Sequence, residues 1–113
     1  MDEDERQFLL TAVWMFMRHG QPARARALCD ALVEEDPRDG VAAVSLAELL
    51  LGEGDAARAL EVLRTADIPS ELVHAEAVLE TRALGILGRK QEASARWRRH
   101  LEASKGSARQ WVE

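Results

Sequence analysis

The chain has 113 residues, 47% of them hydrophobic and 31% charged, which excludes a disordered chain and leaves room for one domain over residues 1–113. The net charge of −5 argues against nucleic acid or an anionic membrane as the main partner. The longest apolar stretch, VAAVSLAELLLG, is too short to cross a bilayer. The acidic start MDEDERQ is unlike a signal peptide, and a single cysteine excludes an internal disulfide framework. We expect a cytoplasmic protein without membrane insertion.

Alanine, leucine, glutamate and arginine are abundant along the whole chain, and this composition favours helix throughout. The stretches HGQP, DPRDG, GEGD and ADIPSE contain the prolines and glycines that interrupt helices. They divide the chain into six predicted helices, over residues 5–18, 22–35, 41–51, 56–65, 70–87 and 90–104. A frayed tail over 105–113, which contains Trp111, is expected to follow.

Two features recur every 34 residues along the chain. The first is a turn glycine, at Gly20, Gly54 and Gly88. The second is a small residue that lets two helices approach closely, at Ala25, Ala59 and Ala93. This period and the paired helices resemble the tetratricopeptide repeat, a helix–turn–helix unit. The resemblance implies an all-α fold of three repeats, about 5–37, 40–69 and 70–104, that form a short right-handed solenoid with a concave groove.

No set of residues in the sequence predicts a catalytic, cofactor or metal site. His19, His74 and His100 are too far apart along the chain for a local metal-ligand spacing, and none is suitably spaced from Cys29. We expect Cys29 to be a buried, unreactive thiol. The basic run RWRRH, which begins at Arg96, is expected on a solvated helix face, the alternative being contact with an acidic partner.

In a tetratricopeptide array the first helix of each repeat lines the concave groove, so the turn glycines can be used to place the groove residues. The lining predicted in this way is Leu10, Trp14, Met17, Val41, Val44, Ser45, Leu51, Val78, Leu79 and Arg82. This mostly apolar set predicts binding of an amphipathic helix or an extended apolar segment. The alternative is that the assignment is shifted by one residue and that some of these residues belong to the core.

The first repeat, FLLTAVWMFMRHGQPARARALCDALVEEDP, also resembles a narrower family, the small tetratricopeptide chaperones of bacterial type III secretion, particularly the YscY type. The residues that carry this resemblance are Phe8, Leu9, Leu10, Trp14, Gly20, Arg24, Ala25, Leu28, Asp30, Ala31, Leu32 and Pro37. The stretch RTADIPSELVH departs from the repeat pattern, which leaves the pitch between the second and third repeats open.

This resemblance implies a cytoplasmic, non-enzymatic chaperone of a Gram-negative bacterium. Its client would be a small secreted or export-apparatus-associated protein whose hydrophobic helix is covered in the groove, in a heterodimer. A chaperone of this kind is expected to be unstable or to self-associate when its client is absent. Two alternatives remain, a needle-subunit chaperone of the related class and a general tetratricopeptide adaptor or assembly protein.

Overall fold

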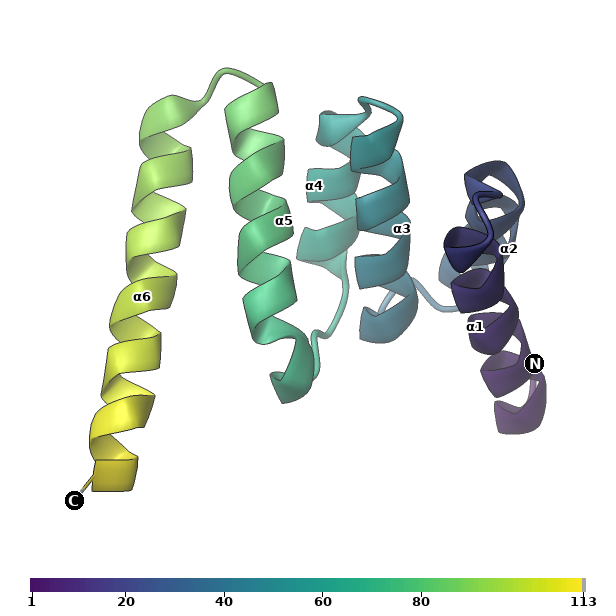
Figure 1. The fold of residues 1–113 in the computed structure, drawn as a ribbon, viewed down its shortest axis with the longest axis horizontal. Coiled ribbons are helices and arrows are strands. Elements are labelled where there is room, and N and C mark those ends of the chain that lie inside the picture. Colours follow the sequence, from purple (N-terminus) through teal and green to yellow (C-terminus); the bar gives the residue numbers. More distant parts are fainter. Residues whose placement is uncertain (113) are drawn as a thin grey trace.

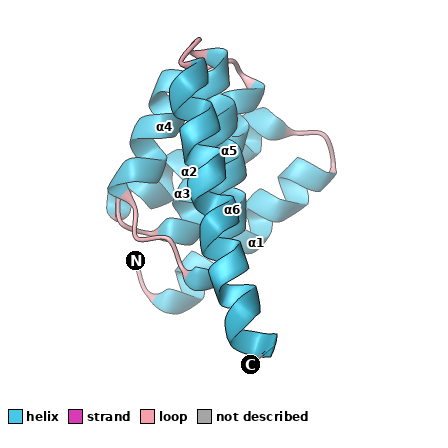
Figure 2. Ribbon diagram, turned by 90° about the vertical axis from the view of Figure 1, so that its left-hand side faces the viewer, coloured by secondary structure: helices cyan, strands magenta, loops and turns pink. Residues whose placement is uncertain are grey.

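The computed structural model describes the backbone of residues 1–112 and the side chains of residues 1–106. Six α-helices follow one another in antiparallel pairs, and α1 and α6 lie at opposite ends of the stack (Figures 1 and 2). Their bounds are α1 Glu3–Arg18, α2 Pro22–Glu35, α3 Gly40–Gly52, α4 Ala56–Thr65, α5 Val73–Ile86 and α6 Lys90–Val112. The predicted all-α solenoid is confirmed.

Local sequence signals explain where most of these helices begin. Three aspartates precede helices, and each side chain accepts a hydrogen bond from a backbone N–H of the first turn: Asp2 caps α1, Asp39 caps α3 and Asp55 caps α4. Pro22 occupies the first position of α2, where its missing N–H costs no hydrogen bond. The first turn of α1 is also acidic, which suits the positive end of the helix dipole.

The 34-residue period of the sequence is repeated in the backbone. Gly20, Gly54 and Gly88 have φ angles of 69°, 83° and 77°, a region that favours glycine. The residue after each glycine donates its N–H to the carbonyl five residues earlier. These bonds join Gln21 to Phe16, Asp55 to Leu50 and Arg89 to Leu84, at 2.8, 2.8 and 2.9 Å. The three turns are therefore one structural motif used three times.

Three predicted helix boundaries differ from the structure by two residues or more. Asp2 acts as the cap, so α1 begins at Glu3, two residues earlier than expected. Ser70–Leu72 form a 3-10 turn, and α5 begins only at Val73. The last helix continues to Val112 instead of ending at Ser104, because no proline follows and a glycine at 106 disfavours a helix by only about 1 kcal/mol. The side chain of Trp111 lies outside the described residues.

The helices within each repeat pack against each other, and the second helix of one repeat packs against the first helix of the next. The first helices of successive repeats, α1, α3 and α5, also lie next to one another. The joint between α1 and α3 differs from the joint between α3 and α5. Helix α3 packs against α5, and its Val44 and Leu51 are buried. The residues 34 positions earlier, Leu10 and Met17 of α1, are only half-buried. The joint between α1 and α3 is therefore more open than the joint between α3 and α5.

The two loops that connect the repeats lie against each other. Asp39 and Asp67 form an isolated parallel β-bridge, in which the Asp67 N–H donates to the Arg38 carbonyl at 3.0 Å. The Arg38 guanidinium also binds the Asp67 carboxylate at 2.9 and 3.0 Å. Gly40 lies so close to this loop that a Cβ there would be 2.2 Å from the Asp67 carbonyl oxygen. These contacts fix the connection into the third repeat.

Candidate functional site

The open joint between α1 and α3 leaves a hollow on the surface of the molecule. The volume of this hollow is about 560 Å³. Three apolar side chains, Leu10, Trp14 and Val41, line it together. The rest of the lining is polar and consists of Arg6, Gln7 and Thr11. We refer to these six residues as the α1–α3 hollow.

An ion pair ties α1 to the start of α3 beside the hollow. The Arg6 guanidinium binds both carboxylate oxygens of Asp39, with Nε–Oδ2 and Nη2–Oδ1 distances of 2.7 and 3.0 Å. The hydrogen bond from Arg6 lowers the pKa of Asp39, although partial burial of the carboxyl acts in the opposite direction. Because Asp39 also caps α3, this one carboxylate fixes both the helix start and the position of α1.

Trp14 is the most accessible apolar residue of the hollow, with 54% of its surface exposed. The Arg18 guanidinium lies over its ring, 4.8 Å from the ring centroid, in a cation–π arrangement. The neighbouring Val41 is also exposed. A large apolar ring beside a fixed positive charge suits an apolar side chain of a partner, with an acidic group close to it.

The structure separates the ten predicted groove residues into surface and core. It brings Leu10, Trp14 and Val41 together in the α1–α3 hollow. Met17, Ser45 and Val78 are half-buried, and Arg82 is exposed on α5. Three residues are corrected, because they are buried in the core between helices and offer a partner little surface: Val44, Leu51 and Leu79.

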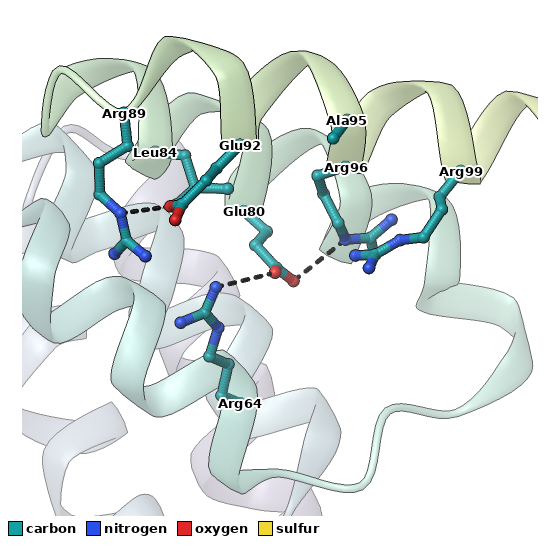
Figure 3. A pocket seen from close by; sticks show the side chains of 8 residues that line it. All are labelled: Arg64, Glu80, Leu84, Arg89, Glu92, Ala95, Arg96 and Arg99. Carbon is teal, nitrogen blue, oxygen red and sulfur yellow. Dashed lines mark ion pairs between the residues drawn. The ribbon is translucent and has the colours of Figure 1, made fainter.

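A second pocket, of about 210 Å³, lies where α4, α5 and α6 meet (Figure 3). Glu80, only 8% exposed, projects into it from α5. Its carboxylate binds Arg96 at 3.2 Å and Arg64 at 3.5 Å. The run that begins at Arg96 was expected on a solvated face, but its first arginine is largely buried in this ion pair. The pocket is therefore occupied by its own charge network, which joins the last two repeats.

The structure also brings together groups that are distant in the sequence. His74 Nδ1 and His100 Nε2 lie 2.9 Å apart, and Trp97 contacts both imidazole rings. Sequence spacing could not reveal this pair, because the residues are on different helices. Cys29 is fully buried, as expected, and burial raises the pKa of its thiol to about 12.

Among the described residues, no three histidine, cysteine, aspartate or glutamate side chains gather in a way that could hold a metal ion. None of the helices described combines the length and apolar character that crossing a membrane requires.

Comparison with known proteins agrees with the repeat pattern. Residues 16–69 match a family model described as Tetratricopeptide repeat. The matched segment runs from the end of α1 to the loop that follows α4. No curated protein matches the chain significantly. Repeats of this kind typically mediate protein–protein interaction. With six helices, three equivalent turns and a matching central segment, the chain folds as a tetratricopeptide-like helical solenoid.

Proposed function

We propose that this protein is a non-catalytic chaperone that binds a hydrophobic helix of a smaller protein at the α1–α3 hollow. The observation that carries this proposal is the cluster of accessible apolar side chains at the open joint, above all Trp14. A half-exposed tryptophan at a concave surface is a common anchor for a partner. The central repeat offers no comparable hydrophobic cluster, since α3 buries most of its apolar residues.

The chemistry of the hollow defines the segment that it binds best. Trp14 and Val41 provide apolar contact, and Arg18 provides a positive charge at the edge. An amphipathic helix fits this surface when an apolar residue and an acidic residue lie on the same face, three or four positions apart. Such a helix, left uncovered, would associate with others of its kind, and covering it is the work of a chaperone.

The client class is proposed from the resemblance of the first repeat to type III secretion chaperones of the YscY type. On this proposal the client is a small secreted or export-apparatus-associated protein, held in a one-to-one complex in the cytoplasm. The alternative is a general tetratricopeptide adaptor, and the match over residues 16–69 favours it equally. The two differ in behaviour, because a chaperone has one client that stabilises it strongly, whereas an adaptor binds several partners weakly.

The test is a pair of matched substitutions on two different sides of α1, since Trp14 lines the α1–α3 hollow and Phe8 does not. Trp14→Glu places a charge in the hollow, whereas Phe8→Glu makes the same kind of change on the other side of the same helix. Isothermal titration calorimetry with small secretion-system proteins should show that Trp14→Glu weakens client binding about 30-fold or more, as loss of an anchor residue does. The Phe8→Glu variant should bind as the wild type does.

Circular dichroism should show the same helix content for both variants, because both side chains are largely exposed. Unchanged client affinity in Trp14→Glu would refute the hollow as the binding site. Equal, weak binding to many unrelated partners would instead favour the adaptor.

A further inference from the structure

Two histidines that are distant in the sequence meet on the surface between α5 and α6. His74 lies in the first turn of α5, and His100 lies near the middle of α6. The two helices pack side by side in the last repeat (Figure 1). His74 Nδ1 and His100 Nε2 are 2.9 Å apart, and the ring centroids are 5.0 Å apart. His74 is exposed and His100 is half-buried, so a dissolved ion can reach the two rings, which we call the histidine pair.

The histidine pair is held loosely by its surroundings. Within residues 1–106, whose side chains the structure describes, the contact between the two rings is the one hydrogen bond that either ring makes. That bond needs one nitrogen to donate and the other to accept, which two neutral imidazoles can provide. Each ring can therefore turn without losing a second partner, so that both nitrogen lone pairs point at one position between the helices. Neutral imidazole nitrogens are common ligands of transition metals.

The distance within the histidine pair selects a type of metal coordination. A metal–imidazole bond is about 2.0–2.1 Å long, so two nitrogens bound at a right angle lie about 2.9 Å apart, and two bound at a tetrahedral angle lie about 3.3 Å apart. The observed 2.9 Å matches the right angle. Right angles belong to the square-planar and octahedral geometries of Cu²⁺ and Ni²⁺, whereas Zn²⁺ prefers a tetrahedron.

We propose that His74 and His100 bind one divalent transition-metal ion, Cu²⁺ most tightly and Ni²⁺ less tightly, with water in the remaining positions. This order follows from the general affinity of nitrogen ligands for these ions. The two ligands come from different helices, so the bound ion links the start of α5 to the middle of α6. Because only the folded chain brings the two rings together, the ion stabilises the third repeat.

The charges around the histidine pair are balanced, so they do not oppose a cation. A surface pocket beside His100 is lined by two glutamates and two arginines, Glu76, Glu80, Arg96 and Arg99. Both glutamates pair with Arg96, at 3.8 and 3.2 Å. The two negative charges offset the two positive charges, and a metal ion at the histidine pair meets no excess of positive charge.

Trp97 provides a built-in reporter for this site. Its ring centroid lies 6.0 Å from that of His74 and 5.4 Å from that of His100. A paramagnetic Cu²⁺ ion bound between the histidines should quench the fluorescence of this indole, whereas Zn²⁺ has no unpaired electron. In a variant with Trp14→Phe and Trp111→Phe, Trp97 is the remaining tryptophan. Its emission should fall as Cu²⁺ is added, and the fall should disappear when His74→Gln is added to this variant.

Isothermal titration calorimetry with Cu²⁺, Ni²⁺ and Zn²⁺ tests the proposal at pH 7.5, because imidazole must be neutral to bind a metal. The wild type should bind Cu²⁺ most tightly. His74→Gln and His100→Gln should each weaken Cu²⁺ binding at least about tenfold, since one remaining ligand cannot chelate the ion. His19→Gln is the matched control, because His19 lies at the end of α1, and it should bind as the wild type does.

Electron paramagnetic resonance of the Cu²⁺ complex tests the coordination itself. The spectrum should be that of a tetragonal ion with two imidazole nitrogens, and each of the two glutamine variants should lose one of them. Circular dichroism shows whether the variants keep their helices, and Cu²⁺ should raise the melting temperature of the wild type only. A wild type that binds Cu²⁺ no more tightly than His74→Gln, or a spectrum without two imidazole nitrogens, would overturn the proposal.

Discussion

The first and third repeats place different chemistry at equivalent positions of one backbone. Glu76 and Glu80 of α5 pair with Arg96 of α6 in their own repeat, and Glu80 also pairs with Arg64 of the preceding repeat, whereas Ala83 is buried. The residues 68 positions earlier, on α1, are the apolar or small Phe8, Ala12 and Met15. The third repeat therefore joins its neighbour partly through buried charges. The first repeat instead presents an exposed apolar face. The 34-residue period therefore determines the course of the backbone, whereas the individual side chains determine what each helix face can bind.

The two joints between repeats differ in the same way. Val44 and Leu51 are buried on α3, which packs against α5, whereas the equivalent Leu10 and Met17 on α1 are only half-buried. The closed joint contributes stability, and the open joint provides the α1–α3 hollow. Five substitutions and a labelling experiment at Cys29 test this contrast.

Gly40→Ala should cause the largest effect, because it disrupts the place where the two connecting loops meet. The new Cβ would lie 2.2 Å from the Asp67 carbonyl oxygen and 2.7 Å from Pro69 Cδ. The backbone must move, at a cost of about 3 kcal/mol in the free energy of unfolding. Urea denaturation measures this loss.

Gly52→Ala is the matched control, because nothing lies within 4 Å of its added Cβ. An alanine near the end of α3 should leave stability unchanged or raise it by up to about 1 kcal/mol. Equal losses in the two variants would mean that the close approach at Gly40 is not what matters.

Replacing the charged contact of the third repeat tests the comparison between repeats directly. Glu80→Leu introduces the residue that α3 has at this position, Leu46, and leaves Arg96 without its nearest partner. We expect a loss of about 2 kcal/mol in unfolding free energy.

Adding Arg96→Val, which copies Val62 of the second repeat, should recover most of that loss, since an apolar pair often replaces a buried ion pair without penalty. Thermal unfolding of the single and double variants measures the coupling. Additive losses would show that Glu80 and Arg96 act independently.

Arg6→Ala should have a smaller, pH-dependent effect, because it removes the ion pair that holds α1 to α3. Near neutral pH the loss should be about 1.5 kcal/mol. The pKa of Asp39 is lowered in the folded protein, so this contribution is present above its unfolded value of about 3.9. It is lost as the pH falls through the lower folded pKa.

Urea denaturation of wild type and Arg6→Ala between pH 7 and pH 2.5 should therefore give curves that converge in acid. A difference that stayed constant down to pH 2.5 would contradict the role of the Asp39 carboxylate.

The smallest effect is expected at Cys29. The equivalent residue of the second repeat, 34 positions later, is Leu63, which is also buried. The fully buried thiol, with a pKa near 12, should not react with an alkylating reagent at pH 8 in the folded protein. It should react once urea unfolds the chain, as mass spectrometry can show. Rapid labelling in the native state would mean that the first repeat opens readily.

The sequence was sufficient to predict the fold, because its signals are local. Turn glycines with positive φ, aspartate caps and Pro22 each define a boundary through their own backbone chemistry. Exact ends were less predictable, and α6 shows why, since nothing in its sequence forces it to stop at Ser104.

The site was only partly predictable, because burial depends on how closely neighbouring helices pack. Leu10 and Val44 occupy equivalent positions, but the first lies in the hollow and the second in the core. The ion pair of the third repeat did leave a signal, since Glu80 and Arg96 replace Leu46 and Val62 within one repeat. The pairing of His74 with His100 left none, because it depends on how two helices are placed.

The most direct test of the proposed function is the mass and thermal stability of the protein, alone and co-expressed with small secretion-system proteins of its operon. If the protein is such a chaperone, light scattering should show a one-to-one complex whose melting temperature is well above that of the free protein. A protein whose mass and melting temperature are unaffected by every such candidate would contradict the chaperone function and leave the general adaptor.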